Sequence, residues 1–228
     1  MNIYLYSRII RDFLFFLALS DEETVRRDEA AAMRVWLVDR LNEIDPALLQ
    51  QIADGLEQEG DNLNEFERRI LSDLIIELQL HNVSSTTDQT DVILRGNGIY
   101  CQLARIIADI HLFFDLTGED KLNLDDSVKM MEYLAGSLHE LDAPFLRELV
   151  DAFTEIAPEY GEAGEAAVRD IARAYGLEEL LAADDPVRLA QLEALNDAHE
   201  FEERDNPLED FPGVDWRADV RRPYLAAS

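Results

Sequence analysis

Apolar residues recur at helical spacing along almost the whole chain. In the most apolar stretch, residues 98–118, two adjoining apolar stripes leave one narrow polar line, formed by Gln102, Arg105 and Asp109. A helix with so little polar surface is normally enclosed by other helices. The pattern therefore predicts a buried central helix over about residues 100–116.

The same pattern occurs 97 residues earlier, without a gap. The stretch beginning Arg8-Ile9-Ile10 matches the stretch beginning Arg105-Ile106-Ile107. Fifteen positions before residue 57 are identical at this offset, where chance would give about three or four. The match predicts an internal duplication of a four-helix unit.

The periodicity and the capping residues together predict an all-α fold, a multi-helix bundle of two tandem four-helix units with a C-terminal helical and irregular extension. Ser20, Asp45 and Asp142 are expected as N-caps, with proline opening the helices after the two aspartates. The expected helices cover residues 1–19, 20–44, 45–60, 63–80, 100–116, 125–141, 142–153, 162–175, 177–181 and 184–201.

Two changes in composition divide the chain. Residues 82–98 are rich in Ser, Thr, Asp, Asn and Gly, which is typical of a loop, although Val92 to Leu94 would also suit a short strand. Residues from Gly176 onward have no counterpart in the first copy. The expected organisation is a first helical repeat over 1–81, a linker loop over 82–98, a second repeat over 99–176 and acidic C-terminal helices and tail over 177–228.

The net charge of the chain restricts the classes of molecule that it is expected to bind. The chain has 49 acidic and 20 basic residues, a net charge of −29 and a pI of about 4.2, while 47% hydrophobic residues suffice for a real core. So much negative charge repels nucleic acid and anionic membranes and favours a basic protein. We expect a cytoplasmic protein, because the N-terminal apolar segment is interrupted by charges and too short to span a bilayer.

The motifs of common enzyme classes are missing from the sequence. It has no Gly-rich phosphate loop, no HExxH, no GxSxG and no Cys/His cluster. Asp73, Glu77 and His81 share a helical face, but a solvated face explains them better than a metal site. The lone Cys101 is interpreted as a small buried hydrophobe. We therefore expect no catalytic residues, no metal and no cofactor.

An Arg–Asp pair with i, i+4 spacing recurs in both copies, as Arg8 with Asp12 and Arg105 with Asp109. Because these helices otherwise look buried, each pair is expected to satisfy itself and its neighbours at the midline of the molecule. The alternative is a charged pair lining a central cleft.

Acidic residues are concentrated near the C-terminus, where residues 177–228 contain fourteen Asp or Glu and five Arg. Spaced aromatic residues and three prolines in the tail suggest that it lies across the body of the protein. The candidate partner-binding residues are Glu200, Glu202, Glu203, Asp205, Glu209 and Asp210.

These features favour a binding protein. An acidic chain without catalytic motifs has the profile of an immunity protein, which neutralises a basic toxin or nuclease by direct binding, and the preference for Arg over Lys is typical of a GC-rich bacterial genome. The alternatives are a helical adaptor with an apolar groove for a peptide or helix, an all-α enzyme with a metal in its core, and adaptation to high salt. A homodimer is also compatible with the aromatic tail.

Overall fold

The computed structural model describes residues 3–59, 63–84, 98–205 and 215–220, which are almost entirely helical. Within these ranges the β-pairing is limited to an isolated antiparallel bridge between Val25 and Leu122. The predicted all-α fold is confirmed. The helices are α1 (Ile3–Leu19), α2 (Arg27–Asn42), α3 (Pro46–Glu59), α4 (Glu65–Ser84), α5 (Ile99–Leu116), α6 (Leu124–His139), α7 (Ala143–Ile156), the 3-10 helix η2 (Ala157–Tyr160), α8 (Gly161–Ala174), α9 (Leu177–Ala182), α10 (Pro186–Asp205) and α11 (Trp216–Asp219).

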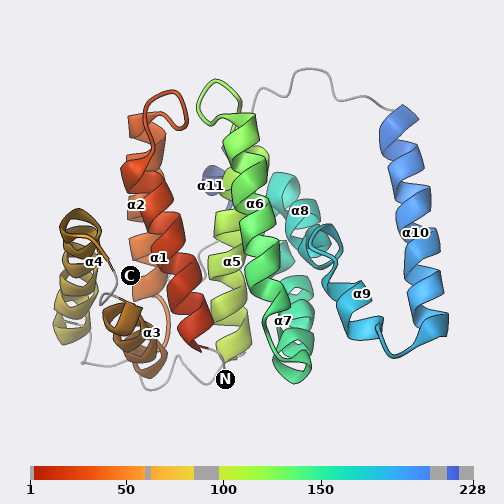
Figure 1. Cartoon of the computed structure of the whole chain (residues 1–228), viewed down its shortest axis with the longest axis horizontal. Coiled ribbons are helices and arrows are strands. Elements are labelled where there is room, and N and C mark those ends of the chain that lie inside the picture. The colour runs from red at the N-terminus through yellow and green to blue at the C-terminus, as the bar shows by residue number, and fades with distance from the viewer. Residues whose placement is uncertain (1–2, 60–62, 85–97, 206–214, 221–228) are drawn as a thin grey trace.

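The two most apolar helices, α1 and α5, lie in the middle of the molecule. Helix α1 packs on α3 and α5 packs on α7, while α2 packs on α5 and α6 lies beside α1 (Figure 1). The ring of Phe13 on α1 meets those of Phe113 and Phe114 on α5 at centroid distances of 5.6 and 5.4 Å. The predicted enclosure of residues 100–116 is correct, because nearly every residue of α5 is buried.

The aspartate caps at the starts of α3 and α7 are as predicted. The Asp45 carboxylate accepts hydrogen bonds from the backbone N–H of Ala47 and Leu48 at 2.9 and 3.1 Å. The Asp142 carboxylate accepts one from Phe145 at 3.0 Å. These bonds satisfy donors that the first helical turn leaves without partners.

The predicted start of the second helix is wrong. Ser20 does not cap it, because residues 20–26 form a loop and α2 begins only at Arg27. The carboxylate of Asp21 holds this loop by accepting from the N–H groups of Glu23 and Thr24 at 3.1 and 2.9 Å. The loop brings Val25 to its bridge with Leu122, and a helix that began at residue 20 would prevent this pairing.

The loop before α2 and the loop before α6 are joined by the isolated bridge. Arg26 N–H donates to the Lys121 carbonyl at 2.8 Å, and Asn123 N–H donates to the Thr24 carbonyl at 2.7 Å. Arg26 and Asn123 are 97 residues apart, as are Thr24 and Lys121. The donors of the two hydrogen bonds are therefore 97 residues apart, and so are the two acceptors, which is the offset seen in the sequence.

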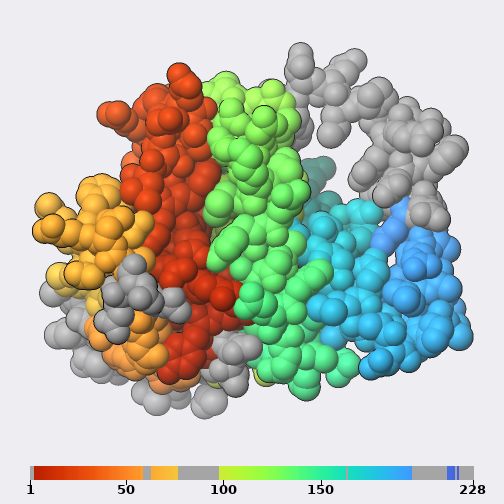
Figure 2. Space-filling view, in the orientation of Figure 1, coloured from red at the N-terminus to blue at the C-terminus, as the bar shows by residue number. Residues whose placement is uncertain are grey.

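One continuous core runs through the described residues. It takes side chains from the range of the first predicted repeat and from that of the second, and adds Trp216 from the tail. Helix α4 extends to Ser84 and α5 begins at Ile99, so most of the predicted linker, including Val92 to Leu94, lies outside the described residues. Figure 2 shows α1 and α6 side by side on one face.

The C-terminal segment returns to the body of the protein at α11. Trp216 is buried, its ring meets that of Trp36 on α2 at 5.4 Å, and α11 packs against α8. Arg217 forms an ion pair with Glu29 of α2. The predicted docking of the tail is thus confirmed for residues 215–220.

Candidate functional site

A buried ion pair between α2 and α5 lies at the centre of the molecule. The Arg40 guanidinium donates to both oxygens of Asp109, at 2.7 and 3.3 Å, and the Tyr160 hydroxyl of η2 donates to the same carboxylate at 2.9 Å. Arg40 is 2% exposed and Asp109 is 0% exposed. A charged pair this deep is tolerated because both partners are held by several hydrogen bonds.

The groups around this ion pair keep one protonation state at ordinary pH. Burial is the largest single influence on the pKa of Arg40 and lowers it, but the attractions to Asp109, Tyr160 and Glu43 together outweigh burial, so the pKa is raised. Burial raises the pKa of Tyr160 well above its usual value, and the charge of Asp109 raises it further. Because neither group titrates near neutral pH, the network is suited to fixing helix register and unsuited to proton transfer.

Both members of the Arg105–Asp109 pair bind groups on other elements. Arg105 donates from two nitrogens to the Glu159 carboxylate, at 2.7 and 2.6 Å, while Asp109 binds Arg40. These contacts reach η2 and α2. The charges do lie at the midline, as expected, but each joins α5 to a different element.

The first copy follows the same rule on α1. Arg8 pairs with Glu140 just after α6, at 2.7 Å, and Asp12 accepts hydrogen bonds from Arg11 and from Tyr133 of α6. These groups are partly exposed, in contrast to Arg40 and Asp109. Arg8, Asp12 and Asp109 therefore contact the opposite half of the molecule, whereas Arg105 binds Glu159 within its own half.

The outer face of α7 carries a line of acidic side chains, here called the α7 acidic stripe. Its members Glu148, Asp151 and Glu155 are all exposed and follow each other at spacings of three and four residues, so they share one side of the helix. Glu159 of η2 follows at the end of the stripe, where Arg105 binds it. The stripe places three exposed carboxylates on one side of α7.

The corresponding face of the first half is different. The residues 97 positions before Glu148 and Glu155 are the neutral amides Gln51 and Gln58, which are also exposed on α3. Like charges at i, i+3 or i, i+4 destabilise a helix by about 0.2–0.5 kcal/mol per pair. The stripe contains two such pairs, while the exposed side of α3 contains one, Asp54 with Glu57.

The thiol of Cys101 lies behind this stripe. Burial raises its pKa to about 11, and the nearby carboxylate of Glu155 adds to the shift. A buried thiol with a raised pKa is a poor nucleophile. Cys101 therefore serves packing, as the sequence suggested.

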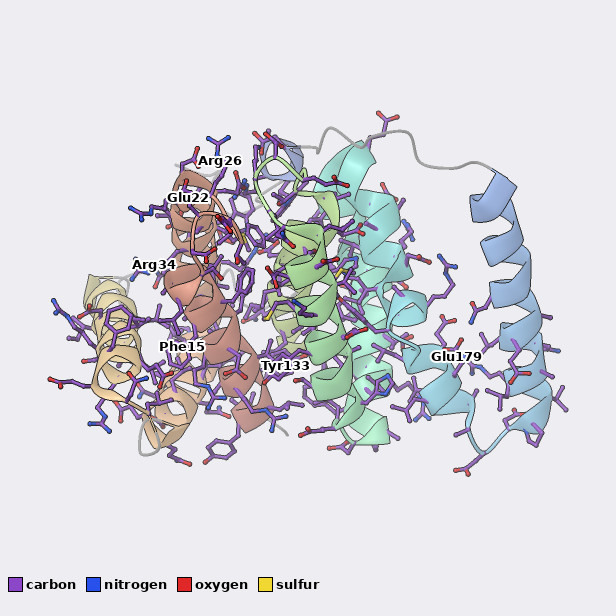
Figure 3. The ribbon with its side chains drawn as sticks, turned by 45° about the horizontal axis from the view of Figure 1, so that its top comes forward. Phe15, Glu22, Arg26, Arg34, Tyr133 and Glu179 are labelled. Atoms are coloured by element: carbon purple, nitrogen blue, oxygen red, sulfur yellow. The ribbon has the colours of Figure 1, made fainter. Side chains whose placement is uncertain are left out.

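The bridged loops form a second acidic region. Asp21, Glu22, Glu23, Glu119 and Asp120 are exposed on these two loops. Figure 3 shows Glu22 at this end of the molecule, close to the start of α2. The reciprocal backbone hydrogen bonds hold the two acidic loops next to each other.

Several basic side chains of the described helices are engaged within the protein. Arg26 binds Asp28 at 2.7 Å and Lys129 binds Asp126 at 2.8 Å. Arg169 binds Glu165 on its own helix, α8. Arg40 and the other midline arginines are used in the contacts above. These internal ion pairs leave the exposed carboxylates of the α7 acidic stripe to face solvent.

The predicted partner-binding residues lie on or beyond α10. The helix backbone includes Glu200, Glu202, Glu203 and Asp205, whose side chains are outside the description, and Glu209 and Asp210 lie outside the described residues. The α7 acidic stripe was missed by the sequence reasoning. The signal was available in the sequence, because Glu148 and Glu155 lie 97 residues after the amides Gln51 and Gln58.

The candidate metal ligands receive no support. Asp73 is exposed on α4, and the side chains of Glu77 and His81 on the same helix are not described. Among the described side chains, no group of three or more His, Cys, Asp or Glu is arranged to hold a metal ion.

No helix in the described ranges has both the length and the apolar character needed to cross a bilayer. Comparison of the chain with protein-family models, curated proteins and solved structures gave no match.

Proposed function

We propose that this protein is an inhibitor of the immunity-protein type, which binds a basic toxin or nuclease in the cytoplasm and blocks it. The observation that carries the proposal is the α7 acidic stripe. Glu148, Asp151 and Glu155 stand exposed on one helix face, where the matching positions of α3 hold Gln51, Asp54 and Gln58. A requirement for solubility alone does not explain why α7 has acids at two positions where α3 has amides.

The repulsion between the carboxylates of the stripe would favour the binding of a basic partner. The mutual repulsion of the three carboxylates is relieved when an arginine or lysine approaches. The large net charge of −29 also steers a cationic partner toward the protein and raises the association rate. Such an inhibitor needs a rigid scaffold, and the buried Arg40–Asp109 pair contributes that rigidity beneath the surface.

We also propose that the chain arose by duplication of a four-helix unit. Helices α2 and α6 begin and end 97 residues apart, as do α3 and α7. The reciprocal hydrogen bonds between the two bridged loops support the same offset. In this account the second copy acquired the acidic stripe after the duplication.

The test is affinity capture from the source organism with the wild-type protein and with the variant Glu148→Gln/Asp151→Asn/Glu155→Gln. We expect wild type to retain a basic protein that elutes at about 0.5 M salt, where the screening length is about 4 Å, and the variant to lose it. Retention of the same protein by the variant, or recovery of no basic protein, would overturn the proposal.

A further inference from the structure

Helix α10 extends along the edge of the molecule with one side covered. It begins after Asp185, whose carboxylate accepts from the N–H groups of Val187 and Arg188, both at 3.1 Å. Its 20 residues span about 30 Å. It packs on α9, and Figure 1 shows it standing apart from the central helices.

The covered side of α10 is formed by residues at helical spacing. Leu189, Leu192 and Asn196 are half-buried, and Asn196 donates a hydrogen bond to Glu179 of α9. Figure 3 shows Glu179 between the two helices. This side holds α10 to the body of the protein.

The outer side is uncovered by the described residues and carries exposed apolar side chains around the polar Gln191. Val187, Ala190 and Ala194 follow each other at spacings of three and four residues, all exposed, with Leu195 beside them. Val187 is 70% exposed and Leu195 65%, more than the other exposed large hydrophobic side chains. Solvent contact for two large apolar groups on one helix is unfavourable and is relieved when a partner covers them.

The charged residues around this face indicate which kind of partner would bind it. Asp184, Asp185 and Glu193 are exposed around this face, against one exposed base, Arg188. A second copy of the chain would bring the same acidic surface and a net charge of −29 with it, which opposes pairing. The chemistry that fits is an apolar helix face flanked by lysine or arginine.

We propose that the outer face of α10, formed by Val187, Ala190, Ala194 and Leu195, binds an amphipathic helix with basic flanks. This inference rests on the proposed function, since it gives the basic partner an apolar anchor besides its charge. Helices dock in this way through residues at i, i+3 and i+7. Charge would then direct the encounter, and the α10 face would set the lifetime of the complex.

The experiment measures binding of a fluorescent amphipathic helix built from leucine and lysine, and of a scrambled peptide with the same composition. The proteins are wild type and Val187→Gln/Leu195→Gln, with Val35→Gln/Phe66→Gln as the control. Val35 and Phe66 are both 58% exposed, on α2 and α4. Glutamine is a good helix former and leaves the net charge unchanged.

We expect the α10 variant to bind the amphipathic peptide about 30-fold more weakly than wild type, and the control variant within about twofold. The scrambled peptide is expected to bind weakly to all three proteins, through charge alone. Equal binding of the amphipathic peptide by the α10 variant and wild type would overturn the inference.

Two further outcomes separate this inference from the proposed function. If substitution of the α7 acidic stripe weakens binding of the amphipathic peptide but that of α10 does not, the inference fails and the proposed function stands. If neither peptide binds, both fail. If wild type dimerises and the α10 variant is a monomer in sedimentation, the face is covered by a second copy and the inference is overturned.

Discussion

The buried ion pair between Arg40 and Asp109 leads to a sharp prediction about stability. The substitution Asp109→Asn keeps the size of the side chain and removes its charge. Arg40 would then remain charged and 2% exposed, because a guanidinium does not lose its proton in proteins, and it would keep Glu43 at 2.9 Å as an ionic partner. The free energy of unfolding should therefore fall by much more than one lost hydrogen bond.

The expected size follows from the burial of both groups. Removing one partner of a buried ion pair costs about 3–5 kcal/mol, against a total stability of about 5–15 kcal/mol for a typical domain. For a protein of this length each kcal/mol lowers Tm by about 2–4 °C, so the loss corresponds to about 6–20 °C. Urea unfolding followed by circular dichroism measures the free energy, and a thermal scan checks Tm.

The chain provides a matched control 97 residues earlier. Asp12 occupies the corresponding position on α1, with its side chain 22% exposed beside Arg11. Because water screens this site, Asp12→Asn should cost about 1 kcal/mol or less. Equal losses for Asp109→Asn and Asp12→Asn would refute the reasoning.

A double substitution tests whether the loss comes from the stranded charge. Arg40→Met/Asp109→Leu removes both charges, and Tyr160 keeps the Arg105 carbonyl as an acceptor at 3.2 Å. Replacing a buried ion pair by apolar residues is often neutral. The double variant should be more stable than Asp109→Asn, and a double variant that is less stable would show that the charge is not the cause.

Gly55→Ala should destabilise the protein by about 1–3 kcal/mol in urea unfolding, because the added Cβ would lie 2.2 Å from the Ser7 hydroxyl. Gly136→Ala, on an exposed part of α6 with nothing near the new Cβ, should stabilise it by about 0.5–1 kcal/mol; the opposite order would contradict the packing of α1 on α3. His111 is buried against the Tyr175 hydroxyl, and burial lowers its pKa below the usual 6.5. The unfolded state then binds the proton more readily, so this part of the stability is fully present above about pH 6.5 and is lost as pH falls below it. His111→Gln should show a smaller loss between about pH 6.5 and 5.5, and an unchanged slope would be evidence against this role.

The sequence predicted the helices well because their signals are local. Periodic apolar residues and the caps at Asp45 and Asp142 lie within the segments that they organise. The start of α2 was missed because its determinant is distant in sequence. Val25 pairs with Leu122, and this bridge keeps residues 20–26 out of the helix.

The partners of charged and apolar side chains were harder to predict. The i, i+4 spacing correctly placed Asp109 near Arg105 on α5. It could not show that Arg40, 69 residues earlier in the chain, binds Asp109. On α10, Val187 and Leu195 are exposed, while Leu189 and Leu192 of the same helix are half-buried. Periodicity identifies a face, but which element covers that face depends on how the helices assemble.

The central claim is that the α7 acidic stripe binds a basic partner, and its most direct test is the dependence of Kd on salt for the captured protein. The variant Glu148→Gln/Asp151→Asn/Glu155→Gln is compared with Asp54→Asn/Glu57→Gln/Glu65→Gln, which removes the same charge from exposed positions of α3 and α4.

If the stripe is the contact, its variant should weaken binding at low salt by more than about tenfold and flatten the salt dependence. The α3–α4 variant should behave like wild type. Equal weakening by both variants would mean that only the overall charge matters, and would contradict the account.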